Sequence, residues 1–435
     1  MDIKTVTIIG ANGTMGCNIS AIFAAFGNAK VYMVSRSIEK SEKAVERAVK
    51  SVKADSIRSK LIPADFSMLE MCVRESDLVF ESASEDFAVK VDIAKEISKY
   101  INDNTICCTG TSGLSVTKLA EVFPEQYRKN YFGIHMYNPP YNMTLCELIP
   151  TEYSDSGLVK ELIGYLSGSL YRTTVVVKDY PAFIGNRIGF QFINEALQYA
   201  DKYKYNGGID YIDSILGQFT GRSMAPLVTS DFVGLDVHKA IVDNLYQNTN
   251  DFAHETFVMP DFSINLIREG KLGRKAGGGL YKVDTRDDGT KRYLVYDIST
   301  NEYREKVKYN FPFVESMVAS LKIGDYASAF HTLINNHSIE AEMCLEFLMK
   351  YIVYSLEVAS VVGYDIHSAD DVMATGFSWC PPLALIQALF GKDYFYQLAK
   401  ERLDRNILDQ IDLEKLLSYV TNSNYDYRRF IRAKR

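Results

Sequence analysis

A histidine and a glutamate are the side chains in this sequence best placed for proton transfer. His135 ends the apolar run 131–135, and Glu147 lies inside the apolar run 145–149. A carboxylate in such a run is costly to bury unless it has a partner, and His135 is the natural partner. The carboxylate would hold one imidazole nitrogen and leave the other to exchange a proton with a substrate. Taken alone, such a pair is more often structural, so a catalytic role needs a second signal.

A glycine-rich segment near the N-terminus supplies that signal. It follows a predicted strand at residues 5–9, precedes a predicted helix at residues 17–26, and reads Gly10-Ala11-Asn12-Gly13-Thr14-Met15-Gly16. Glycines let the backbone turn tightly and approach a pyrophosphate, and the helix N-terminus offers N–H groups. The strand–turn–helix setting favours a dinucleotide loop over a plain turn. We expect five of these residues to contact the cofactor: Gly10, Gly13, Thr14, Met15 and Gly16. Because hydride transfer to nicotinamide from an alcohol requires a base, the loop favours catalysis by His135.

The end of the second predicted strand, residues 30–34, bears on the choice of cofactor. NAD-binding proteins usually place an acid there for the ribose 2′-hydroxyl, but this sequence continues with Ser35 and Arg36. A hydroxyl and a guanidinium suit a 2′-phosphate, because arginine can donate two hydrogen bonds to phosphate oxygens. We therefore predict that either NAD or NADP is used, with a tilt toward NADP. The alternative is that Arg36 stacks on adenine or faces solvent.

Composition excludes several classes of protein. The chain has 435 residues, 47% of them hydrophobic and 24% charged, as in a folded protein of about three domains. With 48 basic and 55 acidic residues its net charge is −7, which argues against nucleic-acid binding. No apolar run reaches about 18 residues and no signal peptide is evident, so we expect no membrane association. Seven cysteines without a CxxC pair, and six histidines without HExxH, predict reduced thiols in a cytoplasmic protein without a metal site.

The order of predicted elements divides the chain into an α/β part and a helical part. Predicted strands lie at residues 5–9, 30–34, 78–81, 105–108, 131–135, 146–149 and 173–177, with helices between them, as at 89–100 and 157–166. This alternation predicts a Rossmann-type, mostly parallel sheet covered on both faces. From the helical segment 183–203 onward, few strands are expected, and the polar stretch 282–308 predicts a turn-rich connection or hairpin.

The helical part carries a loose internal repeat. The stretch 208–227 resembles the stretch 363–383, and each follows a long apolar helix. We predict a tandem duplication, with chance similarity of two helix–turn–helix units as the alternative. The expected domains are therefore residues 1–181, 182–300 and 301–435.

Together these motifs resemble the L-3-hydroxyacyl-CoA dehydrogenases of fatty-acid β-oxidation or its reductive counterpart. The resemblance runs from about residue 4 to 400 and rests on segments 10–16, 85–86, 111–114, 133–140, 181–187 and 273–281, and on Glu147. It implies reversible hydride transfer between C3 of a (3S)-hydroxyacyl-CoA and NAD(P).

The resemblance also implies roles for individual residues. His135 would be the general base that takes the 3-hydroxyl proton, and Glu147 its partner carboxylate. Ser112 and Asn138 would hydrogen-bond the reacting oxygen, and Asn186 would position the substrate. Each of these side chains could instead serve a turn or a helix end.

The resemblance further places Glu85 and Lys90 near the nicotinamide ribose. The sequence departs from the family pattern in three places. The glycine loop has one residue more than the usual GxGxxG, and Ser35 and Arg36 replace the usual acid, which leaves the choice of cofactor open. The stretch after Lys53 is shorter than the segment that embraces CoA in the family.

Basic residues along the predicted helix 38–53 offer a contact to the phosphates of CoA. Lys40, Lys43, Arg47 and Lys50 recur at helical spacing. We predict that Lys43, Arg47 and Lys50 bind CoA, with a solvated charged face as the alternative.

Two other functions stay open at this point. One is a dehydrogenase of a small 3-hydroxy acid without CoA, and the other is a non-catalytic NAD(P)-binding protein. An internal duplication could mimic the helical contact by which single-repeat relatives dimerise, so both a monomer and a homodimer are compatible with the sequence.

Overall fold

The computed structural model describes residues 1–286 and 288–433, which form two compact units. The first unit comprises Met1–Phe183 and Val362–Tyr364, and the second comprises Ile184–Val361 and the chain from Asp365 onward. An α/β region followed by a helical region is confirmed. The predicted boundary between residues 300 and 301 falls inside the second unit and stays a prediction.

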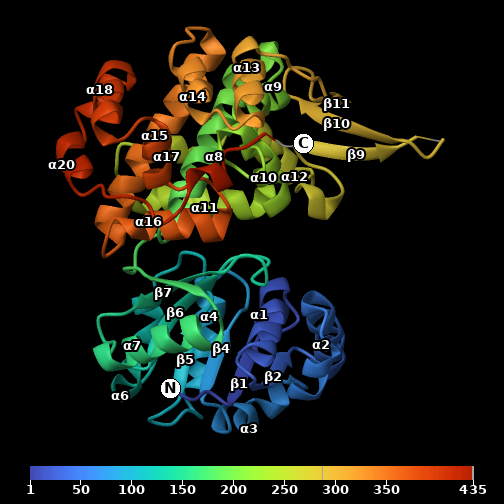
Figure 1. Cartoon of the computed structure of the whole chain (residues 1–435). Coiled ribbons are helices and arrows are strands. Elements are labelled where there is room, and N and C mark those ends of the chain that lie inside the picture. Colours follow the sequence, from blue (N-terminus) through green and yellow to red (C-terminus); the bar gives the residue numbers. More distant parts are fainter. Residues whose placement is uncertain (287, 434–435) are drawn as a thin grey trace. The chain divides into compact units, whose positions relative to one another are not determined.

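The first unit is built on an eight-stranded sheet (Figure 1). Its strands are β1 (Thr5–Ile9), β2 (Lys30–Ser35), β3 (Leu61–Asp65), β4 (Leu78–Glu81), β5 (Ile106–Thr109), β6 (Tyr131–Met136), β7 (Leu145–Pro150) and β8 (Thr173–Val176). The strand order is β3-β2-β1-β4-β5-β6-β7-β8, and β7 is antiparallel to β6 while every other pair is parallel. The order reverses at β1, and this switch point is where open parallel sheets bind ligands.

Seven of these strands match predicted ones, with ends that differ by at most one residue, and β3 was missed. It is only five residues long and carries Pro63 at its centre, and proline lowers strand propensity. β3 forms one edge of the sheet, where a missing N–H is tolerated.

Helices connect the strands of this unit. They are α1 (Thr14–Ala25), α2 (Ile38–Val52), α3 (Leu69–Arg74), α4 (Phe87–Ile97), α5 (Val116–Ala120), α6 (Glu125–Arg128) and α7 (Ser156–Gly164). Apolar side chains from α1, α2 and the central strands share one buried core, which fixes the positions of the strand ends.

The second unit is mostly helical (Figure 1). Its helices are α8 (Gly185–Lys202), α9 (Ile209–Ile215), α10 (Pro226–Val233), α11 (Leu235–Asn248), α12 (Asp261–Arg268), α13 (Pro312–Lys322), α14 (Tyr326–Ile334), α15 (Ile339–Val362), α16 (His367–Val372), α17 (Pro382–Ala388), α18 (Lys392–Arg402), α19 (Arg405–Leu408) and α20 (Leu413–Ser418). The stretch 282–308 forms most of a three-stranded antiparallel sheet of β9 (Tyr281–Thr285), β10 (Lys291–Asp297) and β11 (Glu302–Glu305). Asp287, which belongs to the predicted turn-rich stretch, lies outside the described residues.

Two buried aspartates make the same kind of contact in the two halves of the helical unit. Asp213 Oδ1 accepts a hydrogen bond from the backbone N–H of Leu227, and Asp370 Oδ1 accepts one from that of Leu383, each at 2.8 Å. In both places the acid satisfies an otherwise unpaired N–H at the start of a helix that begins with proline. This correspondence supports the predicted duplication, which stays a prediction.

The seven cysteines are free, buried thiols. Within residues 1–286 and 288–433 no helix combines the length and the apolar character needed to cross a membrane. The same residues contain no group of three or more His, Cys, Asp or Glu side chains that could hold a metal ion.

Candidate active site

The glycine loop connects β1 to α1 at the switch point of the sheet. Gly10 has a φ of +83°, and its N–H donates to Val34 O at 3.0 Å. A Cβ on Gly10 would lie 2.4 Å from Ser82 O, and a Cβ on Gly16 would lie 2.4 Å from Gly10 O. Both positions therefore require glycine, one for the turn and one for the close packing of α1 on the loop.

The start of α1 fits the pyrophosphate of a dinucleotide. Gly13 is half-buried, and a Cβ on it would lie 3.3 Å from Gly10 O and 3.9 Å from Ser82 O, so a side chain here would be crowded. Gly13 is the N-cap and provides no side-chain cap, and the first turn, which begins with Thr14 and Met15, holds no acid. The N–H groups and the positive end of the helix dipole are thus available to an anion.

The end of β2 places the two residues that bear on cofactor choice in different surroundings. Ser35 is 1% exposed, and its Oγ is buried with no hydrogen-bond partner. Arg36 is exposed at the same edge of the sheet. An unpaired buried hydroxyl beside an exposed guanidinium is compatible with a bound polar group at this edge.

A buried ion pair lies behind the loop that follows β4. Lys90 Nζ, on α4, lies 3.0 Å from both carboxylate oxygens of Glu81, and the two side chains are 2% and 5% exposed. Thr109 Oγ1 also donates to Glu81, at 2.7 Å. Sequence analysis singled out Lys90 but missed Glu81. The signal for Glu81 was a single acid that ends a fully apolar strand, where burial demands a partner.

The loops after β4 and β5 are joined through Glu85. Its Oε1 accepts hydrogen bonds from Thr111 Oγ1 at 2.6 Å and from the N–H of Ser112 at 2.7 Å, and its Oε2 lies 3.5 Å from Lys90 Nζ. Glu85 and Lys90, predicted near the cofactor, therefore belong to one cluster together with Ser112. Parallel strands bring this cluster to the carboxyl edge of the sheet.

His135 and Glu147 face each other directly on β6 and β7. His135 Nδ1 lies 2.7 Å from Glu147 Oε2, and the two side chains are 6% and 0% exposed. The Tyr137 hydroxyl donates to the same carboxylate oxygen at 3.0 Å. The His135 ring also packs against Phe183, with the ring centroids 5.6 Å apart. The sequence-predicted pair is thus formed inside the sheet.

This arrangement defines the tautomer of the histidine. A carboxylate only accepts hydrogen bonds, so the Nδ1 of His135 carries the proton that Glu147 binds. In the neutral ring Nε2 then holds the lone pair and can accept a proton. Tyr137 was missed by sequence analysis, although alternation along a strand places it on the same side as His135.

The two predicted asparagines, Asn138 and Asn186, lie in different units. Asn138 follows β6, and its Oδ1 accepts from Asn18 Nδ2 of α1 at 3.2 Å, so its amide N–H₂ is the donor end. Asn186 lies in the first turn of α8, in the second unit, and is 6% exposed.

The basic residues of α2 lie on its exposed side, opposite a buried apolar face. Lys43 pairs with Glu39 at 2.6 Å, whereas Arg47 donates to Asn12 O of the glycine loop at 2.6 Å. Lys50 is exposed in the last turn.

The sheet order and the glycine loop define a Rossmann-type nucleotide-binding protein with a helical second unit. Its sequence matches the family described as 3-hydroxyacyl-CoA dehydrogenase, with the NAD-binding domain over residues 5–180 and the C-terminal domain over residues 183–283. The chain therefore belongs to the 3-hydroxyacyl-CoA dehydrogenase family of oxidoreductases.

Individual relatives agree with this assignment. The chain is 31% identical over 304 residues to a probable 3-hydroxyacyl-CoA dehydrogenase of Deinococcus radiodurans, a match that covers 66% of this chain and 85% of that protein. A Bacillus subtilis protein of the same name is 28% identical over 310 residues, but the match spans 71% of this chain and only 38% of that protein. The solved structure of 3-hydroxybutyryl-CoA dehydrogenase from Escherichia coli shares the fold, with a TM-score of 0.69 over 96% of this chain and 99% of that chain, at 18% identity.

Proposed function

We propose that the chain catalyses reversible hydride transfer between C3 of a (3S)-hydroxyacyl-CoA and NAD(P), as part of fatty-acid metabolism. The observation that carries the proposal is the buried contact between His135 and Glu147, in the sheet whose strand β1 leads into the glycine loop. Membership of the 3-hydroxyacyl-CoA dehydrogenase family supports both the reaction and the acyl-CoA substrate.

In this proposal His135 moves the proton and Glu147 makes the movement favourable. In the oxidative direction Nε2 of His135 takes the proton of the 3-hydroxyl group, and the carboxylate stabilises the imidazolium that results. When bound, the nicotinamide group supplies the acceptor for the hydride that leaves C3. In reduction His135 returns the proton to the oxygen. Tyr137 keeps the carboxylate in place through its hydrogen bond.

Other residues would hold the reacting groups. The hydroxyl of Ser112 and the amide N–H₂ of Asn138 are the donors proposed for the reacting oxygen, because charge develops there as the proton leaves. Asn186 is proposed to orient the substrate.

Lys43, Arg47 and Lys50 are proposed to bind the phosphates of CoA. Their exposure on one side of α2 supports this role.

We also propose that NADP is accepted beside NAD, because Ser35 and Arg36 end β2. Arg36→Ala should reduce kcat/KM for NADPH about tenfold, the loss of one charge-assisted hydrogen bond, and leave that for NADH nearly unchanged. Steady-state kinetics with both cofactors checks this. A wild-type enzyme with a strong preference for NADH would refute the NADP proposal alone.

The decisive experiment follows the oxidation of NADH with acetoacetyl-CoA and, separately, with free 3-oxo acids. His135→Gln should lower kcat by roughly 10²–10⁴. His337→Gln is a matched control, because His337 also contacts a glutamate, Glu342, at 2.8 Å, but on the surface. Turnover of free acids only would indicate the enzyme without CoA. Cofactor binding without any turnover would indicate the non-catalytic protein, and near wild-type turnover by His135→Gln would overturn the acid–base assignment.

The seven free thiols support the further proposal of a reducing compartment such as the cytoplasm. Sedimentation equilibrium distinguishes the monomer from the homodimer.

A further inference from the structure

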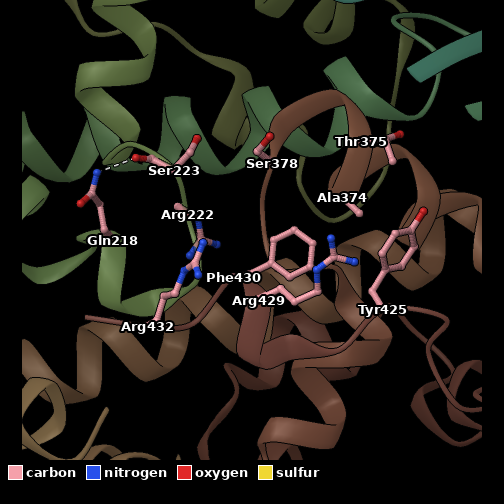
Figure 2. Close-up of a pocket in the computed structure, with 10 residues that line it drawn as sticks. All are labelled: Gln218, Arg222, Ser223, Ala374, Thr375, Ser378, Tyr425, Arg429, Phe430 and Arg432. Atoms are coloured by element: carbon pink, nitrogen blue, oxygen red, sulfur yellow. Dashed lines mark hydrogen bonds between the residues drawn. The ribbon is translucent and has the colours of Figure 1, made fainter. Parts of the chain in front are cut away.

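A pocket of about 730 Å³ opens within the second unit, formed by segments far apart in the sequence (Figure 2). Its lining residues are Gln218, Arg222, Ser223, Ala374, Thr375, Ser378, Tyr425, Arg429, Phe430 and Arg432. They come from the turn between α9 and α10, from the π-helical turn Met373–Phe377 and Ser378 just after it, and from the C-terminal segment. The volume lies within the range of about 300–1,000 Å³ that small-molecule sites occupy.

Arg222 is a buried cation in the wall of this pocket. It is 4% exposed, and within the described part of the chain no carboxylate lies within 4.0 Å of it. One end of its guanidinium donates to Thr220 Oγ1 at 2.9 Å, whereas its Nε is buried without a hydrogen-bond partner. Burial lowers the pKa of Arg222 to about 10, so the group stays charged at neutral pH.

Aromatic rings hold Arg222 in place on its other side. Its guanidinium carbon lies 3.8 Å from the ring centroid of Phe192 and 4.8 Å from that of Trp379. Such contacts offset part of the desolvation of a cation, but they do not neutralise its charge. The Arg222 guanidinium is therefore held in place with its charge available to an anion.

Two more arginines line the same pocket. Arg429 and Arg432 are exposed, and in residues 1–286 and 288–433 neither has a carboxylate within 4.0 Å. None of the ten lining residues is acidic. Two acids on the neighbouring segments have other partners: Asp371 accepts from the Tyr425 hydroxyl at 2.7 Å, and Asp426 accepts from the Arg428 N–H at 2.9 Å.

Three like charges around one cavity repel each other, and an anion bound between them would offset this repulsion. Guanidinium groups match phosphate oxygens in geometry and donate two hydrogen bonds at once. Tyr425 and Phe430 add aromatic surface to the same wall. We propose that this pocket binds a small molecule with at least two phosphate groups, which Arg222, Arg429 and Arg432 hold. All lining residues of this site belong to the second unit, whereas the glycine loop belongs to the first.

Calorimetry on the full-length chain tests this binding site. Inorganic pyrophosphate and ADP are titrated separately in the presence of saturating NADH, so that the dinucleotide site is filled. The expected result is one site per chain. Arg429→Ala combined with Arg432→Ala should weaken binding at least about tenfold, because two charge-assisted contacts are lost. Arg405→Ala, at an exposed arginine of the same unit, should leave the affinity unchanged.

Comparison of the two probes separates the contributions to binding. Equal affinities would assign the site to phosphates alone, and a tighter complex with ADP would add a contact to the base. The proposal is overturned if saturating NADH abolishes all binding, or if the double variant binds as tightly as wild type.

A variant of the buried arginine gives an independent check. Arg222→Met removes the charge but keeps an apolar side chain among the rings, so the thermal midpoint should stay the same or rise, while pyrophosphate affinity falls at least about tenfold. A large fall in the midpoint of Arg222→Met together with unchanged pyrophosphate affinity would make Arg222 a purely structural residue.

Discussion

The molecule contains two histidine–glutamate contacts of nearly equal length in very different surroundings. His135 Nδ1 lies 2.7 Å from Glu147 in the sheet, and His337 Nδ1 lies 2.8 Å from Glu342 at the start of α15. The side chains of the first pair are 6% and 0% exposed, whereas those of the second are 68% and 38% exposed. The length of the contact therefore does not distinguish a buried pair from a surface pair.

The surroundings of the two pairs determine how strongly each glutamate charge acts on its histidine. His135 and Glu147 are opposite residues on paired strands, so backbone hydrogen bonds hold them face to face in a medium of low dielectric constant. Glu342 also accepts from Arg402 at 2.7 Å, and the His337 ring is largely exposed to water. Water and salt screen the charge of Glu342, so its electrostatic interaction with His337 is weak.

The largest expected effect concerns the other buried pair of the first unit. Lys90→Met would leave the Glu81 carboxylate buried without its cation, and the free energy of unfolding should fall by about 3–5 kcal/mol. Lys99→Met removes a lysine from an exposed contact with Glu96 and should change it by less than about 1 kcal/mol. Urea denaturation of both variants measures the difference. Equal losses would show that burial does not separate the two kinds of pair.

Removing one carboxylate charge tests the catalytic comparison directly. Glu147→Gln keeps a hydrogen-bond acceptor for His135 but not the charge that stabilises the imidazolium, so kcat should fall about 10²-fold. Glu342→Gln should leave kcat unchanged. Both are checked by steady-state assays with acetoacetyl-CoA. Full activity of Glu147→Gln would reduce its carboxylate to a structural role.

Asp213 is a buried acid without a histidine partner, and it shows what burial does to a carboxyl group that no base stabilises. Burial raises the pKa of Asp213 from 3.8 to about 6, although Tyr281 donates to it at 2.6 Å. The folded state thus binds this proton more tightly, and the stability it contributes is present below pH 3.8 and lost as the pH rises through about 6.

Asp213→Asn removes this titration. The destabilisation caused by the substitution should therefore be smaller at pH 7 than at pH 4, by about 2 kcal/mol. Urea denaturation at the two pH values checks it, with Asp201→Asn as an exposed control. A destabilisation that does not depend on pH would contradict the raised pKa of Asp213.

The sequence was most informative at residues whose chemical type differs sharply from that of their neighbours, such as an acid within an apolar run. Glu147 in an apolar run predicted its contact with His135, and the glycine loop predicted the turn between the first strand and the first helix. Both signals are local, because burial of a charge and a positive φ leave few alternatives. The fold class followed from the alternation of strands and helices.

Glu81 was missed although it ends an apolar strand only nine positions before Lys90, and β3 was missed because Pro63 lowers its strand propensity. Contacts that depend on distant segments were out of reach. The pocket around Arg222 unites residues about two hundred positions apart, and no local pattern marks them. The roles assigned to Ser112, Asn138 and Asn186 came from the family resemblance and stay predictions.

The buried cysteines allow the unfolding of the protein to be followed by chemical labelling of their thiols. Burial raises the pKa of every one of the seven thiols, to about 11 for Cys72 and to about 12 for Cys146 and Cys344. Only the thiolate attacks an alkylating reagent, so at neutral pH the native chain presents almost no reactive sulfur. Because these residues are spread over both units, the order in which they become labelled in denaturant records which parts of the chain come apart first.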